Sequence, residues 1–222
     1  MYTKAGVAKK IDHAVLKPTA TDDDVVAAAR MCVRRAVGNL CVRPTDVALA
    51  AATLRGTDTT VAAVIGFPHG SHRSEAKALE ARLAVEDGAD ELDIVMNIGK
   101  FLSGDEEWVR KELDAVIEES RPHGVLTKII LETCFLDPKQ IERACRIAAA
   151  AGADYVKTST GFGSGPATPE AVAIMIRTVG NTLGVKASGG IRSWNQAVAY
   201  LDQGCQRLGL SSTEAVLDGA PA

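Results

Sequence analysis

Two lysines interrupt apolar, strand-like runs of the chain, and each is followed at once by small and hydroxyl-bearing residues. Lys157 lies in AGADYVKTSTGFG, and Lys186 lies in LGVKASGGIR. Desolvation in the interior of a strand penalises the charged ammonium form and lowers the pKa of a lysine. Because only the neutral amine is a nucleophile, both lysines are candidates for chemistry.

The natural chemistry of a neutral lysine amine is attack on a carbonyl carbon. The product is a Schiff base, whose iminium draws electrons from a carbon–carbon bond that is being broken or formed. At the reference pKa near 10.4, only about 0.04% of lysine side chains are neutral at pH 7, and a pKa of about 7 requires roughly 4–5 kcal/mol of destabilisation of the ammonium. Burial of Lys157 and the nearby cation of Lys186 would supply it.

Such a reaction also needs groups that carry protons and groups that hold the substrate. Asp93 in ELDIVMN and Asp12 in IDHAVL are carboxylates within strand-like runs. Side-chain alternation puts Glu91 and Asp93 on the same face of their strand. The backbone N–H groups of a Gly-Gly turn at 189–190 and the hydroxyls at 211–212 are suitable donors for a phosphate monoester.

The elements that must position these residues alternate between strand and helix along the whole chain. Short runs rich in Val, Ile and Leu predict strands at 11–16, 39–44, 60–67, 91–97, 126–133, 154–159, 184–188 and 206–211. Amphipathic stretches predict helices at 22–36, 45–55, 74–87, 105–120, 137–150, 168–180 and 193–203. Asp137 and Thr168, each before a proline, indicate helix starts. Four glycines are expected to follow helices: Gly38, Gly88, Gly152 and Gly204.

Eight strand–helix units in 222 residues favour an α/β fold, a single (β/α)8 TIM barrel that spans 1–222 as one domain. An open doubly wound sheet is the alternative, but no G-x-G-x-x-G follows the first strand and no Walker sequence occurs. Reactive groups of a barrel gather at the carboxyl ends of its strands, and phosphate is commonly held after strands 7 and 8. Lys157, Lys186 and the two phosphate-donor segments would then share one mouth, with Asp93 pointing into the barrel.

Composition and charge exclude several other classes of function. A formal charge of −3 offers no basic surface for nucleic acid or anionic lipid. The five cysteines are scattered and fit a reducing cytosol. No signal-like or membrane-spanning apolar run occurs, so we expect a cytoplasmic protein without a membrane partner. His69 and His72 form an H-x-x-H, but no third ligand is evident, so capping or solvent exposure is favoured and no metal is expected.

The order of the motifs resembles that of the deoxyribose-phosphate aldolase family. The matching segments run from about residue 11 to 212 and are IDHAVLKP, LCVRP, VIGFPHG, GADELDIVMNIG, KIILET, DYVKTSTGFG, VKASGGIR and RLGLSS. The resemblance implies a class I aldolase without metal or cofactor. Its reaction would be the reversible cleavage of 2-deoxy-D-ribose 5-phosphate to D-glyceraldehyde 3-phosphate and acetaldehyde. It also implies a homodimer.

The same resemblance implies roles for individual residues. Lys157 would form the Schiff base, Lys186 would depress its pKa, and Asp93 would relay protons with Lys186 and water. Asp12 and Cys41 would lie by the reacting end of the substrate. The residues implied around the phosphate are Gly161, Gly189, Gly190, Ser211 and Ser212. The chain departs from the family at Ala14, where many members have Thr, and at Thr213, where Gly is common.

Alternatives remain for the function and for two of the residues. The chain could be another Schiff-base barrel lyase acting on a different phosphorylated aldehyde or keto acid, or a non-catalytic barrel that binds a sugar phosphate. Cys41 is more simply a buried small hydrophobe than a nucleophile. Lys128 in LTKIILET is expected at the start of its strand, which favours a structural or supporting role.

Overall fold

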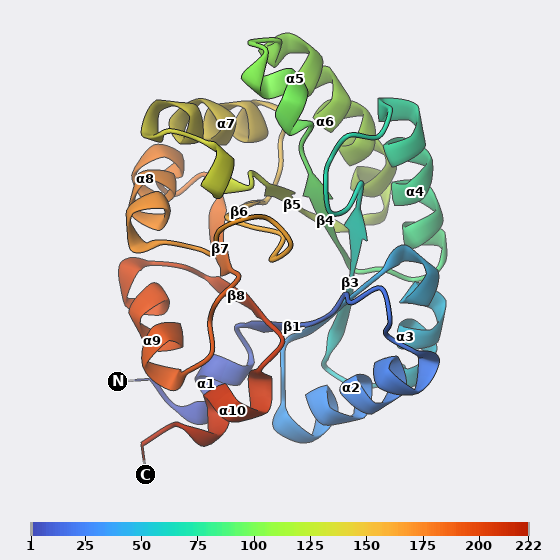
Figure 1. Cartoon of the computed structure of the whole chain (residues 1–222). Helices are drawn as coiled ribbons and strands as arrows, with labels where there is room; N and C mark the ends of the chain where they lie inside the picture. Colours follow the sequence, from blue (N-terminus) through green and yellow to red (C-terminus); the bar gives the residue numbers. More distant parts are fainter. Residues whose placement is uncertain (1, 222) are drawn as a thin grey trace.

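A computed structural model describes residues 2–221, and its centre is a closed barrel of eight parallel strands (Figure 1). Each strand pairs with its neighbours in sequence order, and β8 closes the barrel against β1, with Asp12 opposite Gly209. The strands are β1 Ile11–Val15, β2 Asn39–Val42, β3 Thr60–Ile65, β4 Glu91–Val95, β5 Leu126–Ile130, β6 Tyr155–Lys157, β7 Gly184–Ser188 and β8 Arg207–Leu210. The predicted TIM barrel is confirmed.

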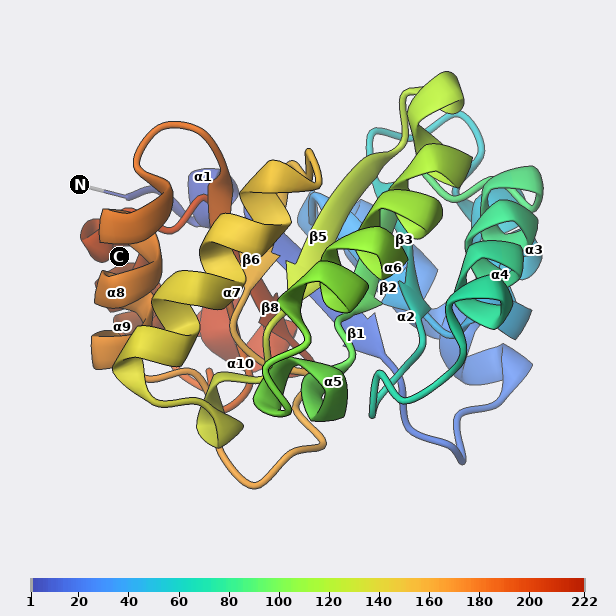
Figure 2. The same ribbon diagram turned by 90° about the horizontal axis from the view of Figure 1, so that it is seen from above.

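Helices ring the barrel on its outside (Figures 1 and 2). They are α1 Lys4–Ala8, α2 Asp22–Arg35, α3 Val47–Leu54, α4 Ser74–Glu86, α5 Ile98–Leu102, α6 Glu106–Ser120, α7 Pro138–Ala150, α8 Pro169–Val179, α9 Trp194–Gln203 and α10 Thr213–Asp218. The seven long helices match the sequence prediction, whereas α1, α5 and α10 are too short to show a helical period. Within residues 2–221, no helix is long and apolar enough to cross a membrane.

Except for β7, which ends at Ser188 as predicted, the strands end earlier than the sequence pattern predicts, by up to three residues at β5. The residues beyond β5 and β6 remain buried because they fold over the end of the barrel. Leu131 N donates to Lys157 O at 3.0 Å, and Thr133 N donates to Thr158 O at 2.9 Å. The apolar pattern therefore continues into loops that form the mouth, and it cannot mark the last ladder residue.

The helix boundaries follow the predicted capping signals except at one glycine. Asp137 accepts from Gln140 N in a reciprocal capping box, and Thr168 accepts from Ala171 N. The prediction that Gly38 ends α2 is wrong, because Ala36 takes the left-handed position at φ 52°. Gly38 serves a close approach instead, since a Cβ there would lie 2.2 Å from Lys9 O.

The two faces of the barrel wall differ in chemistry. Leu92, Ile94 and Ile129 alternate outward and are fully buried in the apolar layer between strands and helices. The residues that alternate inward include Asp93 and Lys128, which are also fully buried. The wall thus separates an apolar shell that holds the helices from an interior that contains ionisable groups.

Candidate active site

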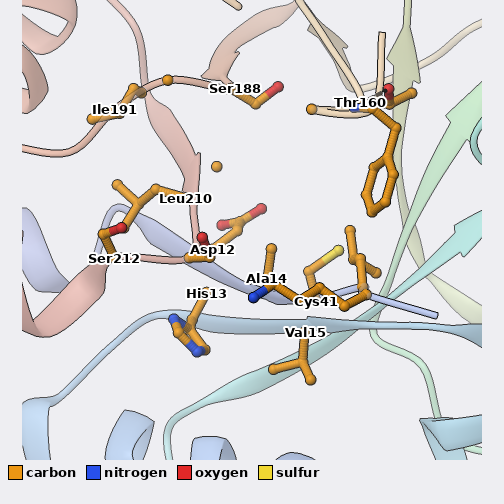
Figure 3. A pocket seen from close by; sticks show the side chains of 18 of the residues that line it. Asp12, His13, Ala14, Val15, Cys41, Thr160, Ser188, Ile191, Leu210 and Ser212 are labelled. Carbon is orange, nitrogen blue, oxygen red and sulfur yellow. Dashed lines mark hydrogen bonds between the residues drawn. The ribbon is translucent and has the colours of Figure 1, made fainter. Parts of the chain in front are cut away.

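A cavity of about 900 Å³ opens at the carboxyl ends of the strands (Figure 3). Figure 3 shows Asp12, Cys41, Ser188 and Ser212 around it, brought together from β1, β2, β7 and the segment after β8. Asp93 does not line the cavity but lies fully buried beneath it. The other residues of the predicted site do line it: Asp12, Cys41, Lys157, Gly161, Lys186, Gly189, Gly190, Ser211 and Ser212.

The two lysines stand side by side over one carboxylate oxygen. Lys157 and Lys186 are register partners across β6 and β7. The Nζ atom of Lys157 lies 2.6 Å from Asp93 Oδ2, and the Nζ atom of Lys186 lies 2.7 Å from the same oxygen. The close separation that the Schiff-base hypothesis requires is therefore present.

The surroundings shift the pKa values of the two lysines in opposite directions. Burial lowers the pKa of Lys157, the cation of Lys186 lowers it further, and Asp93 opposes them without reversing the shift. Burial also acts to lower the pKa of Lys186, but Asp12 and Asp93 together outweigh it and raise that pKa. Lys186 additionally donates to Asp12 Oδ2. Of the two amines, Lys157 is thus the one that loses its proton more readily.

Asp93 connects the lysines of three adjacent strands. Its second oxygen, Oδ1, accepts from Lys128 Nζ at 2.7 Å. Burial acts to raise the pKa of Asp93, but Lys128, Lys157 and Lys186 hold it well below the usual range. The carboxylate is therefore ionised and fixed in place by its partners.

Cys41 lies beside the carboxylate of Asp93 and contributes a neutral side chain to the wall of the cavity. Its Sγ atom is 3.9 Å from Asp93 Oδ2, and burial together with Asp93 raises the pKa of the thiol to about 11. A thiol with that pKa is a poor nucleophile near neutral pH. Its neighbours inside the barrel, Ala62 and Val64, are small and apolar and form a cluster with it.

The ionic network continues toward the amino end of the barrel through Glu91 and Arg207, to which sequence reasoning assigned no role. Lys128 also bonds Glu91, and Arg207 joins Glu91 to Asp12, with Nη2 3.0 Å from Glu91 Oε2 and Nε 2.7 Å from Asp12 Oδ1. The expected place of Lys128 at the start of its strand is wrong, since it is the third residue of β5 and the register partner of Asp93. Strand alternation was the available signal, because Glu91 shares the face of Asp93.

The far wall of the cavity offers donors to an anion. Gly189 and Gly190 follow β7 with φ of 85° and 77°, and a Cβ on Gly190 would lie 2.8 Å from Pro166 Cβ. This left-handed turn places no side chain over its backbone amides, although the amide of Gly189 already donates to Gly209 O at 3.4 Å. Lys17 and Arg192, which sequence reasoning missed, add two cations to the lining. Both belong to the quoted motifs IDHAVLKP and VKASGGIR.

A buried carboxylate holds the loop between β6 and α8, which carries Gly161. Glu132 adopts a left-handed conformation at φ 54° with only 2% of its surface exposed. It accepts hydrogen bonds from the backbone N–H of Thr160 at 3.2 Å and from the Thr160 hydroxyl. Phe162, two residues after Thr160 in the same loop, packs its ring edge-on against that of Phe67, with the ring centroids 5.3 Å apart. Loops from two sides of the barrel thus meet over the mouth.

Two further features concern histidines. His13 Nδ1 lies 2.8 Å from the hydroxyl of Thr213, so the unusual Thr213 orients a residue of the cavity wall. Burial lowers the pKa of His13 to about 4, which keeps its ring neutral. His69 and His72 are exposed, and the described part of the chain contains no group of three or more His, Cys, Asp or Glu suited to a metal ion.

Comparisons with known proteins point to one family. A family model described as "DeoC/LacD family aldolase" matches residues 6–208. The deoxyribose-phosphate aldolase of Thermococcus gammatolerans is 45% identical over 216 residues, which are 96% of each chain. The crystal structure of a putative deoxyribose-phosphate aldolase from Coccidioides immitis is similar, with a TM-score of 0.94, 34% identity, and coverage of 98% of this chain and 86% of that one. A deoxyribose phosphate aldolase from Aeropyrum pernix, described as a unique tetrameric structure, has a TM-score of 0.91, 32% identity, and coverage of 97% and 91%.

Proposed function

The chain belongs to the DeoC/LacD aldolase family, and on that premise we propose that it is a deoxyribose-phosphate aldolase. It would cleave 2-deoxy-D-ribose 5-phosphate reversibly to D-glyceraldehyde 3-phosphate and acetaldehyde. The observation that carries the proposal is the pair Lys157 and Lys186 on one oxygen of Asp93, with pKa values shifted in opposite directions. A class I aldolase needs one neutral amine beside a fixed cation.

The reaction begins on Lys157. Its neutral amine attacks C1 of the open-chain aldehyde, and the carbinolamine loses water to give an iminium. Lys186 and Asp93, with water, would relay the protons that the leaving hydroxyl needs. The new positive charge forms where Asp93 already provides a carboxylate at 2.6 Å from the nitrogen.

Bond cleavage then follows from the electron demand of the iminium. The proton of the C3 hydroxyl passes to the relay of water, Asp93 and Lys186, the C2–C3 bond breaks, and its electron pair moves into an enamine as glyceraldehyde 3-phosphate leaves. Protonation of the enamine at C2 and hydrolysis release acetaldehyde and restore Lys157. Lys186 is suited to the relay because it bonds both Asp12 and Asp93 and lines the cavity.

The remaining lining residues divide by the end of the substrate that they would meet. We assign Asp12 and Cys41 to the reacting end, where the neutral thiol provides a small wall. Lys17 and Arg192 add charge attraction at the phosphate end. The donors assigned to the phosphate are Gly161, Gly189, Gly190, Ser211 and Ser212.

The wider setting of the enzyme is part of the proposal. We propose one aldolase domain over 1–222 that needs no cofactor and works in the cytoplasm as a homodimer. A similar protein is described as tetrameric, so light scattering on the purified protein decides between the two assemblies. Activity in excess EDTA tests the metal-free reaction, because a metal-assisted aldolase would lose its turnover.

The proposed function is tested by coupled detection of glyceraldehyde 3-phosphate from 2-deoxy-D-ribose 5-phosphate. We expect turnover by the wild type and by Lys139→Ala, an exposed-lysine control on α7, and none by Lys157→Ala. Turnover of only another phosphorylated aldehyde or keto acid would favour the alternative lyase. Sugar-phosphate binding without turnover of any such substrate would favour a binding protein.

A further inference from the structure

We propose that Glu91 and Arg207, at the amino end of the barrel interior, jointly set the protonation of Lys157 although neither lines the cavity. They would be positioning residues that act through Lys128, Asp12 and Asp93. The inference rests on the proposed function, since it concerns how the Schiff-base lysine is kept neutral. It adds a second layer of control beneath the contacts that Lys157 itself makes.

The contacts form two routes from this pair to the two lysines. Glu91 bonds Lys128, whose Nζ atom lies 2.7 Å from Asp93 Oδ1, and Asp93 holds Lys157 with its other oxygen. On the other side, Arg207 bonds Asp12, which accepts from Lys186. Arg207 Nη2 closes the ring at 3.0 Å from both oxygens of Glu91. Every member of this ring meets an opposite charge.

The charges of the ring do not balance when all its groups are ionised. Its acidic members are Asp12, Glu91 and Asp93, and its basic members are Lys128, Lys157, Lys186 and Arg207. Three negative charges therefore face four positive ones. A buried excess charge is costly in a medium of low dielectric constant. Loss of the proton from Lys157 brings the ring to neutrality.

Two other ionisable groups, Cys41 and Glu132, lie near Lys157 but outside the ring. The raised pKa of Cys41 keeps the thiol neutral. Glu132 bonds Thr160 and not a member of the ring, but it is close enough for the charge of Lys157 to act on it: burial raises the pKa of Glu132, and Thr160 and Lys157 oppose that shift. It lies outside the ring and is unchanged in variants of Glu91 and Arg207. From β3, the neutral side chain of Thr60 donates to Glu91 Oε1 at 3.3 Å, and Thr60 accepts from Asn39 Nδ2 of β2 at 2.8 Å.

The sign of the effect follows from the charge removed. Neutralising Glu91 increases the positive excess, which disfavours the ammonium and lowers the pKa of Lys157. Neutralising Arg207 removes the surplus positive charge of the ring. The ammonium form of Lys157 is then less disfavoured, and its pKa rises. Because neither side chain lines the cavity, these variants remove no direct contact with the substrate.

The test is the pH profile of kcat/KM for the retro-aldol reaction. The acidic limb of that profile reports the pKa of the Lys157 amine in the free enzyme. We expect Glu91→Gln to move that limb to lower pH and Arg207→Met to move it to higher pH. On the acidic limb, kcat/KM relative to its own plateau would change roughly threefold to tenfold in each direction. The double variant removes one charge of each sign, so its limb coincides with that of the wild type.

The charge-conserving variants Arg207→Lys and Glu91→Asp separate charge from packing. Both disturb the geometry of the pair but should leave the limb unmoved. Shifts of the two neutralising variants in the same direction, no shifts, or equal shifts in the charge-conserving variants would overturn the proposal. If a single neutralising variant does not fold, the double variant decides, and a limb displaced from that of the wild type refutes the idea.

The outcome for the wild type keeps this inference separate from the proposed function. A wild-type protein without retro-aldol turnover means that the proposed function is wrong. Normal turnover together with coincident limbs for the wild type and the two neutralising variants means that only the remote control of Lys157 is wrong. Normal turnover with opposite shifts supports both.

Discussion

The two faces of the same barrel wall are built on opposite principles. On the outside, Leu92 and Ile129 pack against helices as part of one continuous apolar cluster. On the inside, the side chains one position along, Asp93 and Lys128, bond each other at 2.7 Å within an ionic ring. Burial of apolar area stabilises the fold without regard to direction, whereas a buried ion pair contributes little net stability unless its partners are complete. Stability and chemistry are thus assigned to alternate residues of the same strands.

The largest effect on activity is expected from substitution of the inner-face residue Lys157. Lys157→Met removes the amine, and kcat should fall by roughly a thousandfold or more. Its unfolding free energy should stay within about 1.5 kcal/mol of the wild type, because Asp93 keeps Lys128 and Lys186 as partners. Coupled assays and urea unfolding measure the two quantities. A variant that unfolds readily while its folded fraction stays active would contradict the division.

Asp93 is the inner residue on which stability does depend. Asp93→Asn leaves Lys128 and Lys186 without the carboxylate that they share, and we expect a loss of about 3–5 kcal/mol in unfolding free energy. Asp202→Asn, at an exposed position on α9, is the matched control and should stay within about 0.5 kcal/mol. Equal melting curves for the two variants would show that the ring does not need its central anion.

An outer-face substitution should have the opposite signature to that of Lys157. Ile129 is fully buried in the apolar shell, and Ile129→Ala should reduce the unfolding free energy by about 2–5 kcal/mol. The folded variant should retain kcat within roughly threefold, because the side chain faces away from the ring. Leu126→Ala, at a partly exposed position on the same strand, serves as control with a smaller loss. A loss of kcat without a loss of stability in Ile129→Ala would contradict the separate roles of the two faces.

The smallest effect is expected above the wall, where two loops meet over the mouth. Phe67 and Phe162 form an edge-to-face pair at 5.3 Å, and such pairs contribute about 0.5–1.5 kcal/mol beyond their area. A double-mutant cycle with Phe67→Leu and Phe162→Leu, read by thermal unfolding, should return a coupling in that range. Strict additivity would mean that the rings touch without stabilising the mouth.

The sequence was sufficient to predict the barrel and the shared mouth, because alternating strand and helix patterns leave few topologies. Lys157 and Lys186 were identifiable because an ammonium group is anomalous in an apolar strand. Glu91 carried the same kind of signal through its alternation with Asp93, but its partner Arg207 lies more than a hundred residues away. Which distant strands meet in the interior depends on the closed register, and the sequence pattern does not fix that.

Local features near the mouth were also beyond sequence reasoning, for a different reason. Glu132 falls inside the predicted strand 126–133, whereas the structure gives it a left-handed backbone and hydrogen bonds from the distant Thr160. The short helices α1, α5 and α10 span five or six residues each, too few to establish a helical period. Tertiary contacts, not propensity, determine these segments.

The central claim is that the two adjacent lysines have unequal roles. Borohydride reduction of the wild type in the presence of 2-deoxy-D-ribose 5-phosphate, followed by peptide mass mapping, tests it most directly. We predict one stable adduct per chain, on Lys157, with Lys186 unmodified. An adduct on Lys186, or a protein that turns over substrate without any adduct on Lys157, would contradict the account.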